Sequence, residues 1–89
     1  MTFSTLRVSE VKQNMGQLVK KLRTQKKITQ EELAKQLNLS RITIQNIERG
    51  NNFTIDTSLL VLEYFNEMAS WHHFVTQKLD QVHTIKSIY

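Results

Sequence analysis

The sequence predicts a compact all-α fold of five helices, the last of which could be replaced by a short C-terminal strand. Three observations lead to this prediction. Apolar residues recur at spacings of three and four along most of the 89 residues, as one face of a helix requires. Residue types that cap helix N-termini precede several of these runs. Asn38 and Gly50, which both tolerate a positive φ, stand where two of the runs end.

The N-terminal segment predicts an arm followed by a long helix. Residues 1–8 hold β-type residues in loose alternation, which fits an arm, an extended segment or a short strand that pairs two subunits. Ser9 predicts the N-cap of a helix that runs to about Gln25. Gly16 inside this helix costs about 1 kcal/mol relative to Ala, so we expect another helix to approach closely there.

The stretch from Thr29 to Gly50 predicts two short helices joined by a tight turn. Thr29 and Glu32 have the spacing of a capping box, in which each side chain accepts a hydrogen bond from the other residue's backbone amide. Asn38 predicts the chain reversal. Ser40 predicts the N-cap of the second helix, and Gly50 predicts its left-handed C-cap. This arrangement is a helix-turn-helix, whose second helix is short enough to lie in a DNA major groove.

A fourth helix is predicted from Ser58 to about Met68. Asp56 or Thr57 would cap its N-terminus. Bulky apolar side chains in this helix are expected to supply much of the core. They belong to Leu59, Leu60, Leu62, Tyr64 and Phe65. The predicted helix-turn-helix domain therefore spans residues 9–68.

The last segment, residues 69–89, is predicted to be a helix or tail that mediates dimerisation. Ser70 would cap it, and apolar side chains follow at helical spacing. They belong to Trp71, Phe74, Val75, Leu79 and Val82. Large aromatic side chains that stay exposed on a monomer mark an interface, although Trp71 and Phe74 could instead complete a small core. Residues 83–89 alternate well enough to form a strand.

The charge of the chain is unevenly distributed. The formal net charge is +4. Residues 1–50 hold ten Lys and Arg against four acidic residues, whereas residues 51–89 hold two against four. The positive half therefore contains the predicted helix-turn-helix, as a phosphate-binding surface requires.

Several classes of protein and site are not expected. The chain has no Cys, which excludes disulfides, thiolate zinc sites and Cys nucleophiles. The neighbouring His72 and His73 point about 100° apart on a helix, and neither they nor His83 are joined by a carboxylate cluster. We therefore expect no metal, no cofactor, no catalytic residue and no enzymatic activity. No apolar run approaches membrane-spanning length and no signal-peptide pattern is visible, which predicts a cytoplasmic protein without membrane contact.

Four separated motifs resemble those of the Xre/Cro-repressor family of DNA-binding domains. They follow in the family's order: LeuArg at 22–23, ThrGlnGluGluLeuAla at 29–34, LeuSerArg at 39–41 and IleGluArgGly at 47–50. The resemblance covers roughly residues 17–65. It implies a lambda-repressor-like helix-turn-helix domain that binds double-stranded DNA.

The second helix of the helix-turn-helix is predicted to read DNA bases. Its side chains that project away from the Ile44 and Ile47 face can reach base edges. They match the base-reading positions of the resembled family and belong to Arg41, Ile42, Gln45 and Asn46. Arginine pairs with guanine, side-chain amides pair with adenine, and an aliphatic side chain packs on thymine methyl groups. Ile42 borders the buried face and could instead belong to the core.

The resemblance also implies contacts to DNA phosphates. The family's phosphate-contacting positions match Gln30, Ser40 and Arg49. Gln30 stands at the start of a helix, so that the helix dipole can add to its contact. The family usually carries a basic or Pro-containing stretch after the recognition helix, and this chain has neither. Asn51 could therefore contribute only neutral hydrogen bonds there.

Arg23 and Glu48 match two family positions that commonly form a partly buried ion pair. The pair would hold the first helix against the recognition helix, and its role would be structural. Removing one partner should cost more than an exposed pair contributes, because the other charge would be left poorly solvated. The alternative is two unrelated charges on the surface, which contribute little to stability.

These inferences together predict a transcriptional regulator that acts as a homodimer. We expect a repressor that binds a near-palindromic operator with half-sites about 34 Å apart. One alternative is an antitoxin similar to HipB-like proteins, which bind DNA and a toxin kinase, because residues 6–15 and the short tail resemble those proteins. A further alternative is a protein-interaction module that has kept the fold without DNA binding.

Overall fold

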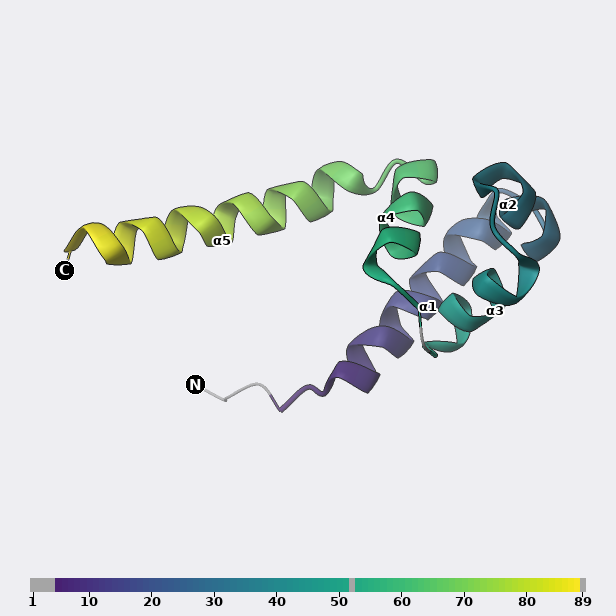
Figure 1. Ribbon diagram of the computed structural model, residues 1–89, viewed down its shortest axis with the longest axis horizontal. Helices are drawn as coiled ribbons and strands as arrows, with labels where there is room; N and C mark the ends of the chain where they lie inside the picture. The colour runs from purple at the N-terminus through teal and green to yellow at the C-terminus, as the bar shows by residue number, and fades with distance from the viewer. Residues whose placement is uncertain (1–4, 52, 89) are drawn as a thin grey trace.

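The computed structural model describes residues 5–51 and 53–88, with the side chains of the last helix described as far as His83. Five helices follow in this order: α1 (Val8–Gln25), α2 (Gln30–Leu37), α3 (Arg41–Arg49), α4 (Ile55–Tyr64) and α5 (Met68–Ile88) (Figure 1). The described residues contain no strand. The predicted all-α fold of five helices is confirmed. The alternative of a C-terminal strand is wrong, because α5 continues to Ile88.

Helices α1 to α4 form a compact body, and α5 extends from it as an arm (Figure 1). Within the body, α3 packs against both α1 and α2. The arm makes the molecule elongated, with extents of 51 × 25 × 22 Å. The free end of α5 lies at the left of Figure 1, far from α2 and α3. Among the described helices, none has the length and apolar character that a membrane crossing requires.

Among the described residues, seven apolar side chains form the buried core of the body. They belong to Val19, Leu33, Ala34, Ile44, Ile47, Val61 and Phe65. The prediction that Leu60 fills the core is wrong because its side chain is exposed, and Leu59 and Leu62 are only half-buried. Apolar residues occupy several sides of α4, so periodicity does not reveal its inward face. Packing selects the face that carries Val61 and Phe65.

The local signals between Thr29 and Gly50 form as predicted. The Glu32 N–H donates to the Thr29 hydroxyl at 3.1 Å, and the Thr29 N–H donates to a Glu32 carboxylate oxygen at 2.8 Å. Asn38 ends α2 with φ of 56°, and Gly50 ends α3 with φ of 72°. These hydrogen bonds and turns join residues close in the chain, which is why sequence spacing predicts them.

Other predicted helix starts are wrong by a few residues. Helix α1 begins before Ser9, and no side chain caps it. Thr54 caps α4 instead of Asp56 or Thr57, because its hydroxyl accepts a hydrogen bond from the Thr57 N–H at 3.2 Å. Helix α5 begins before Ser70. Several cap-type residues stand near each start, so sequence alone does not choose among them. Residues 1–4 of the predicted N-terminal arm lie outside the described residues, and residues 5–8 form no strand.

Gly16 lies where α1 crosses α3. A Cβ atom added at Gly16 would lie 2.5 Å from the carbonyl oxygens of Ile47 and Glu48, a distance that real Cβ atoms do not show. Glycine therefore permits the backbones to approach more closely than any other residue would. The predicted close approach of another helix is confirmed, and the crossing fixes the position of α3 on the body.

Candidate nucleic-acid interface

The candidate interface is built on α3, whose ends are set by its own sequence. The Ser40 hydroxyl accepts a hydrogen bond from the Thr43 N–H at 3.0 Å, and Gly50 closes the helix. Ile44 and Ile47 are buried, with exposed fractions of 0% and 1%. Helix α3 thus keeps one face in the core and presents the opposite face to solvent.

The four side chains predicted to read bases lie on or beside the outward face of α3. Arg41 and Ile42 are exposed, and Gln45 and Asn46 are half-buried. Ile42 is 66% exposed, so the alternative that it belongs to the core is wrong. The face offers a guanidinium group, two amides and one aliphatic side chain, which are the groups that read bases in the major groove.

Glu48 ties α3 to the two preceding helices. Its carboxylate accepts hydrogen bonds from Arg23 Nε at 2.5 Å and from Arg23 Nη2 at 3.0 Å. Arg23 Nη1 also donates to the backbone oxygen of Ile28 at 2.9 Å. The side chains of Arg23 and Glu48 are 11% and 4% exposed. These two residues are therefore not unrelated surface charges, and the pair holds α3 against α1.

Gln30 takes part in the same cluster. Its Nε2 donates a hydrogen bond to Glu48 Oε1 at 3.0 Å, and the side chain is half-buried. The resemblance implies a phosphate contact for this residue and gives no sign of the bond to Glu48. An amide nitrogen carries two hydrogens, so one remains for a further acceptor. The bond joins residues 18 positions apart, which is why sequence spacing does not reveal it.

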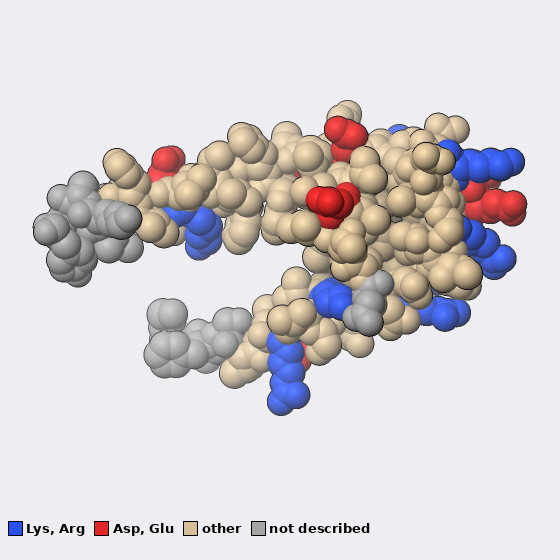
Figure 2. Space-filling view, in the orientation of Figure 1, with Lys and Arg blue, Asp and Glu red and all other residues tan. Residues whose placement is uncertain are grey.

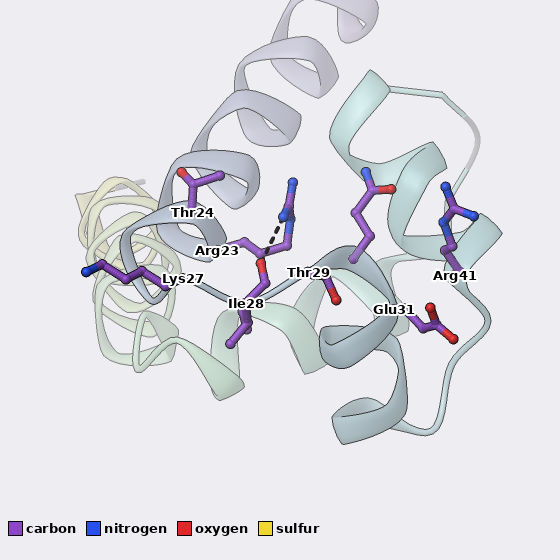
Figure 3. A pocket seen from close by; sticks show the side chains of 8 residues that line it. Arg23, Thr24, Lys27, Ile28, Thr29, Glu31 and Arg41 are labelled. Atoms are coloured by element: carbon purple, nitrogen blue, oxygen red, sulfur yellow. Dashed lines mark hydrogen bonds between the residues drawn. The ribbon is translucent and has the colours of Figure 1, made fainter.

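A shallow hollow of about 560 Å³ lies beside the starts of α2 and α3 (Figure 3). Lys27 and Arg41 line it from opposite sides, together with Glu31 and Gln30. Lys27 occupies the turn after α1 with φ of 58°. The motifs do not single out Lys27, because a lysine in a solvated turn forms no distinctive pattern. Only the fold brings Lys27 to the same hollow as Arg41 of α3.

The other residues implied in phosphate contacts lie at the ends of α3. Ser40 is exposed at the N-terminus of the helix, and Arg49 and Asn51 are exposed at its C-terminal end. Figure 2 shows Lys and Arg side chains gathered at the end of the molecule that carries α2 and the α1–α2 turn, and along α1, whereas the α5 arm shows few charges. The positive surface therefore belongs to the body.

The five residues predicted to mediate dimerisation form an exposed apolar stripe on α5. Their exposed fractions lie between 37% and 62%, and they are Trp71, Phe74, Val75, Leu79 and Val82. The rings of Trp71 and Phe74 stack with centroids 5.6 Å apart. Because both rings remain more than a third exposed, they do not complete the core of the body.

Comparison with known families agrees with this geometry. A family model described as helix-turn-helix, of the Xre/Cro-like type, matches residues 19–69, more than half of the chain. The chain belongs to the Xre/Cro-like helix-turn-helix family. At the level of its family, the protein is a DNA-binding transcription regulator, and the family is typically non-enzymatic. The match takes in α2, α3 and α4 and ends where α5 begins. A search of curated proteins found no match for this chain.

Proposed function

We propose that the protein represses transcription by binding, as a homodimer, to a near-palindromic operator in double-stranded DNA. The observation that carries this proposal is the outward face of α3. A partly buried ion pair and a glycine crossing hold the opposite side of this helix against the body. The outward side keeps an isoleucine 66% exposed beside polar side chains. A DNA major groove has groups that complement each of these side chains.

Each residue of the outward face has an assigned partner in this proposal. Arg41 pairs bidentately with guanine, and Gln45 or Asn46 pairs with adenine. Ile42 packs on a thymine methyl group. Each good pair contributes about 1–3 kcal/mol of discrimination against the wrong base. This chemistry supports sequence-specific binding and not only general attraction to DNA.

Phosphate contacts would orient α3 in the groove. Arg49 and Asn51 contact phosphates at one end of the helix. At the other end, Ser40 and the remaining Gln30 hydrogen meet a phosphate that also lies near the N-terminal dipoles of α2 and α3. Lys27 adds a positive charge on the far side of the hollow. These contacts supply affinity that depends on salt concentration and does not depend on sequence.

Selection of bound fragments from random duplex DNA tests this function. We expect enrichment of one near-palindrome whose half-sites are centred about 34 Å apart, one helical turn of DNA. The mass of the free protein, measured alongside, should be that of a dimer. Absence of binding even at low salt would instead favour a protein-interaction module without DNA binding. Copurification of DNA-bound protein with the product of a neighbouring gene would favour the antitoxin role and its toxin partner.

A further inference from the structure

Two exposed apolar surfaces meet at the base of the arm. The first is the α5 stripe, whose apolar residues lie on both sides of Lys78, between Val75 and Leu79. The second is a groove of about 390 Å³ between α1, α4 and α5, whose lining includes Met15, Phe53 and Trp71. Because Trp71 belongs to both surfaces, the stripe runs continuously into the groove.

We infer that the α5 helices of two copies pair antiparallel, with Val75 of one copy opposite Lys78 of the other. This inference rests on the proposed homodimer and specifies its direction and register. The pairing is isologous, so each contact occurs twice about the two-fold axis. The same register sets Trp71 opposite Val82, so that a bulky ring meets a small aliphatic side chain. The occupant of each stripe is a second copy of this chain.

The position of Lys78 favours the antiparallel direction. In an in-register parallel pair the two Lys78 ammonium groups would stand at the same level of an apolar seam, where like charges repel, whereas the antiparallel register staggers them by three residues, about 4.5 Å along the helix axis. In the antiparallel pair each Lys78 lies opposite Val75, which can pack against its aliphatic stem. Lys78 Nζ already lies 5.9 Å from the centroid of the Phe74 ring, so an aromatic face stabilises the charge within its own chain.

The groove gives a second reason for the antiparallel direction. In the antiparallel pair, the α5 helix of one copy passes Trp71 of the other copy and continues toward that copy's body, where the groove lies. A parallel helix would instead end away from both grooves. The antiparallel pair therefore covers the stripe and the groove with one element. It also supports α5 itself, because most of the stability of a helix in a protein comes from the packing of its apolar face.

Disulfide formation tests the direction, since the chain has no Cys of its own. Two Val82→Cys copies in the antiparallel register would lie about 16 Å apart along the helix axis, beyond the roughly 7 Å that a disulfide can bridge between Cα atoms. Oxidised Val82→Cys protein should therefore give no disulfide-linked dimer. A mixture of Val82→Cys and Trp71→Cys proteins should give the mixed disulfide. A Phe74→Cys and Leu79→Cys mixture repeats the test with Trp71 in place, because these positions also face each other in the antiparallel register but lie five residues, about 7.5 Å, apart along the axis of a parallel pair.

The outcomes separate this inference from the proposed homodimer. A native mass of one chain would overturn the homodimer itself. A dimer in which Val82→Cys links to itself would establish the parallel direction and overturn this inference. A dimer without either mixed disulfide would also overturn it, since α5 would then lie outside the interface. Only a dimer that forms the mixed disulfides and lacks the Val82→Cys homodimer supports it.

A substitution at the groove tests its coverage by the second copy. Ile55 lines the groove and is 64% exposed, so Ile55→Glu should leave the body folded. The introduced charge should weaken dimerisation about tenfold, which corresponds to the lost burial of roughly two methylene groups. Leu18→Glu is the matched control, because Leu18 is an exposed apolar residue outside the groove. Equal dimerisation of the two variants would show that the helix end does not cover the groove.

Discussion

The body and the arm of this protein differ in how far their apolar side chains are buried. In the body, residues such as Leu33, Ile44 and Val61 are completely buried, and each comes from a different helix. Along α5, by contrast, Leu79 and Val82 are more than half exposed although their side chains are of the same kind. The body therefore has a buried apolar core of its own, whereas the described side chains of the arm include no buried one.

The difference indicates which contacts each region depends on. The body is held by contacts within the chain, including a buried ion pair, so its stability should not depend on protein concentration. The arm has few intrachain contacts beyond its own helical hydrogen bonds, and in the proposed dimer a second copy covers its apolar face. Substitutions in the body should therefore change unfolding, and substitutions in the arm should change association.

Loss of the Glu48 carboxylate should have the largest effect on the body. Glu48→Ala leaves the Arg23 guanidinium without its ion-pair partner in a site where it is only 11% exposed. We expect a loss of about 3–5 kcal/mol in the free energy of unfolding, measured by urea titration. Glu63→Ala removes an exposed carboxylate from α4 and should change it by less than about 0.5 kcal/mol. Similar values for the two variants would contradict the structural role of the pair.

A charge on the stripe should affect the arm and spare the body. Phe74→Asp should raise the dimer dissociation constant at least tenfold, because burial of a Phe side chain contributes about 1.5–3 kcal/mol. The unfolding of dilute protein should remain unchanged. His73→Asp places the same charge on the same helix away from the stripe and is the matched control. Native mass at several protein concentrations measures the effect, and equal masses for both variants would argue against the stripe as the interface.

Arg41→Ala should alter base preference without altering stability. Arg41 is exposed at the first position of α3, so its loss leaves the core intact. We expect preference at one base pair in each half-site to relax by about 1–3 kcal/mol, measured as relative affinities for operator variants. Arg49→Ala, proposed at a phosphate, should weaken binding to all sequences alike. If Arg41→Ala also weakened binding uniformly, Arg41 would be a phosphate contact.

The smallest expected effect is a pH dependence in the first turn of α2. The backbone N–H of Thr29, followed by its hydroxyl, holds the pKa of Glu32 below its ordinary value of 4.5. Since the folded pKa is lower than the unfolded one, this stabilisation is present above pH 4.5 and is lost as pH falls through the folded pKa. We therefore expect the free energy of unfolding of the Glu32→Gln variant to fall less on acidification than that of the unmodified protein. Parallel pH curves would rule out this contribution.

The helix-turn-helix could be recognised from sequence because its signals are local. Thr29 and Glu32 cap each other across three positions, and Asn38 and Gly50 adopt the positive φ that their side chains permit. The start of α4 could not be recognised in this way, because Thr54, Asp56 and Thr57 are all suitable caps. Where only one nearby residue suits a capping position, the sequence identifies the cap. Where several nearby residues suit it, packing determines which of them caps the helix.

The sequence by itself determined the five helices, the turn between α2 and α3, and the positive charge of the first half. These features depend on residues near one another in the chain or on composition alone. Tertiary structure decided that Gln30 bonds to Glu48, that Ile42 faces solvent and that Lys27 lines the same hollow as Arg41. It also decided that α5 leaves the body with its apolar stripe uncovered. The physical reason is that these relations depend on how helices distant in sequence pack, and hydrophobic periodicity specifies a face without specifying what covers it.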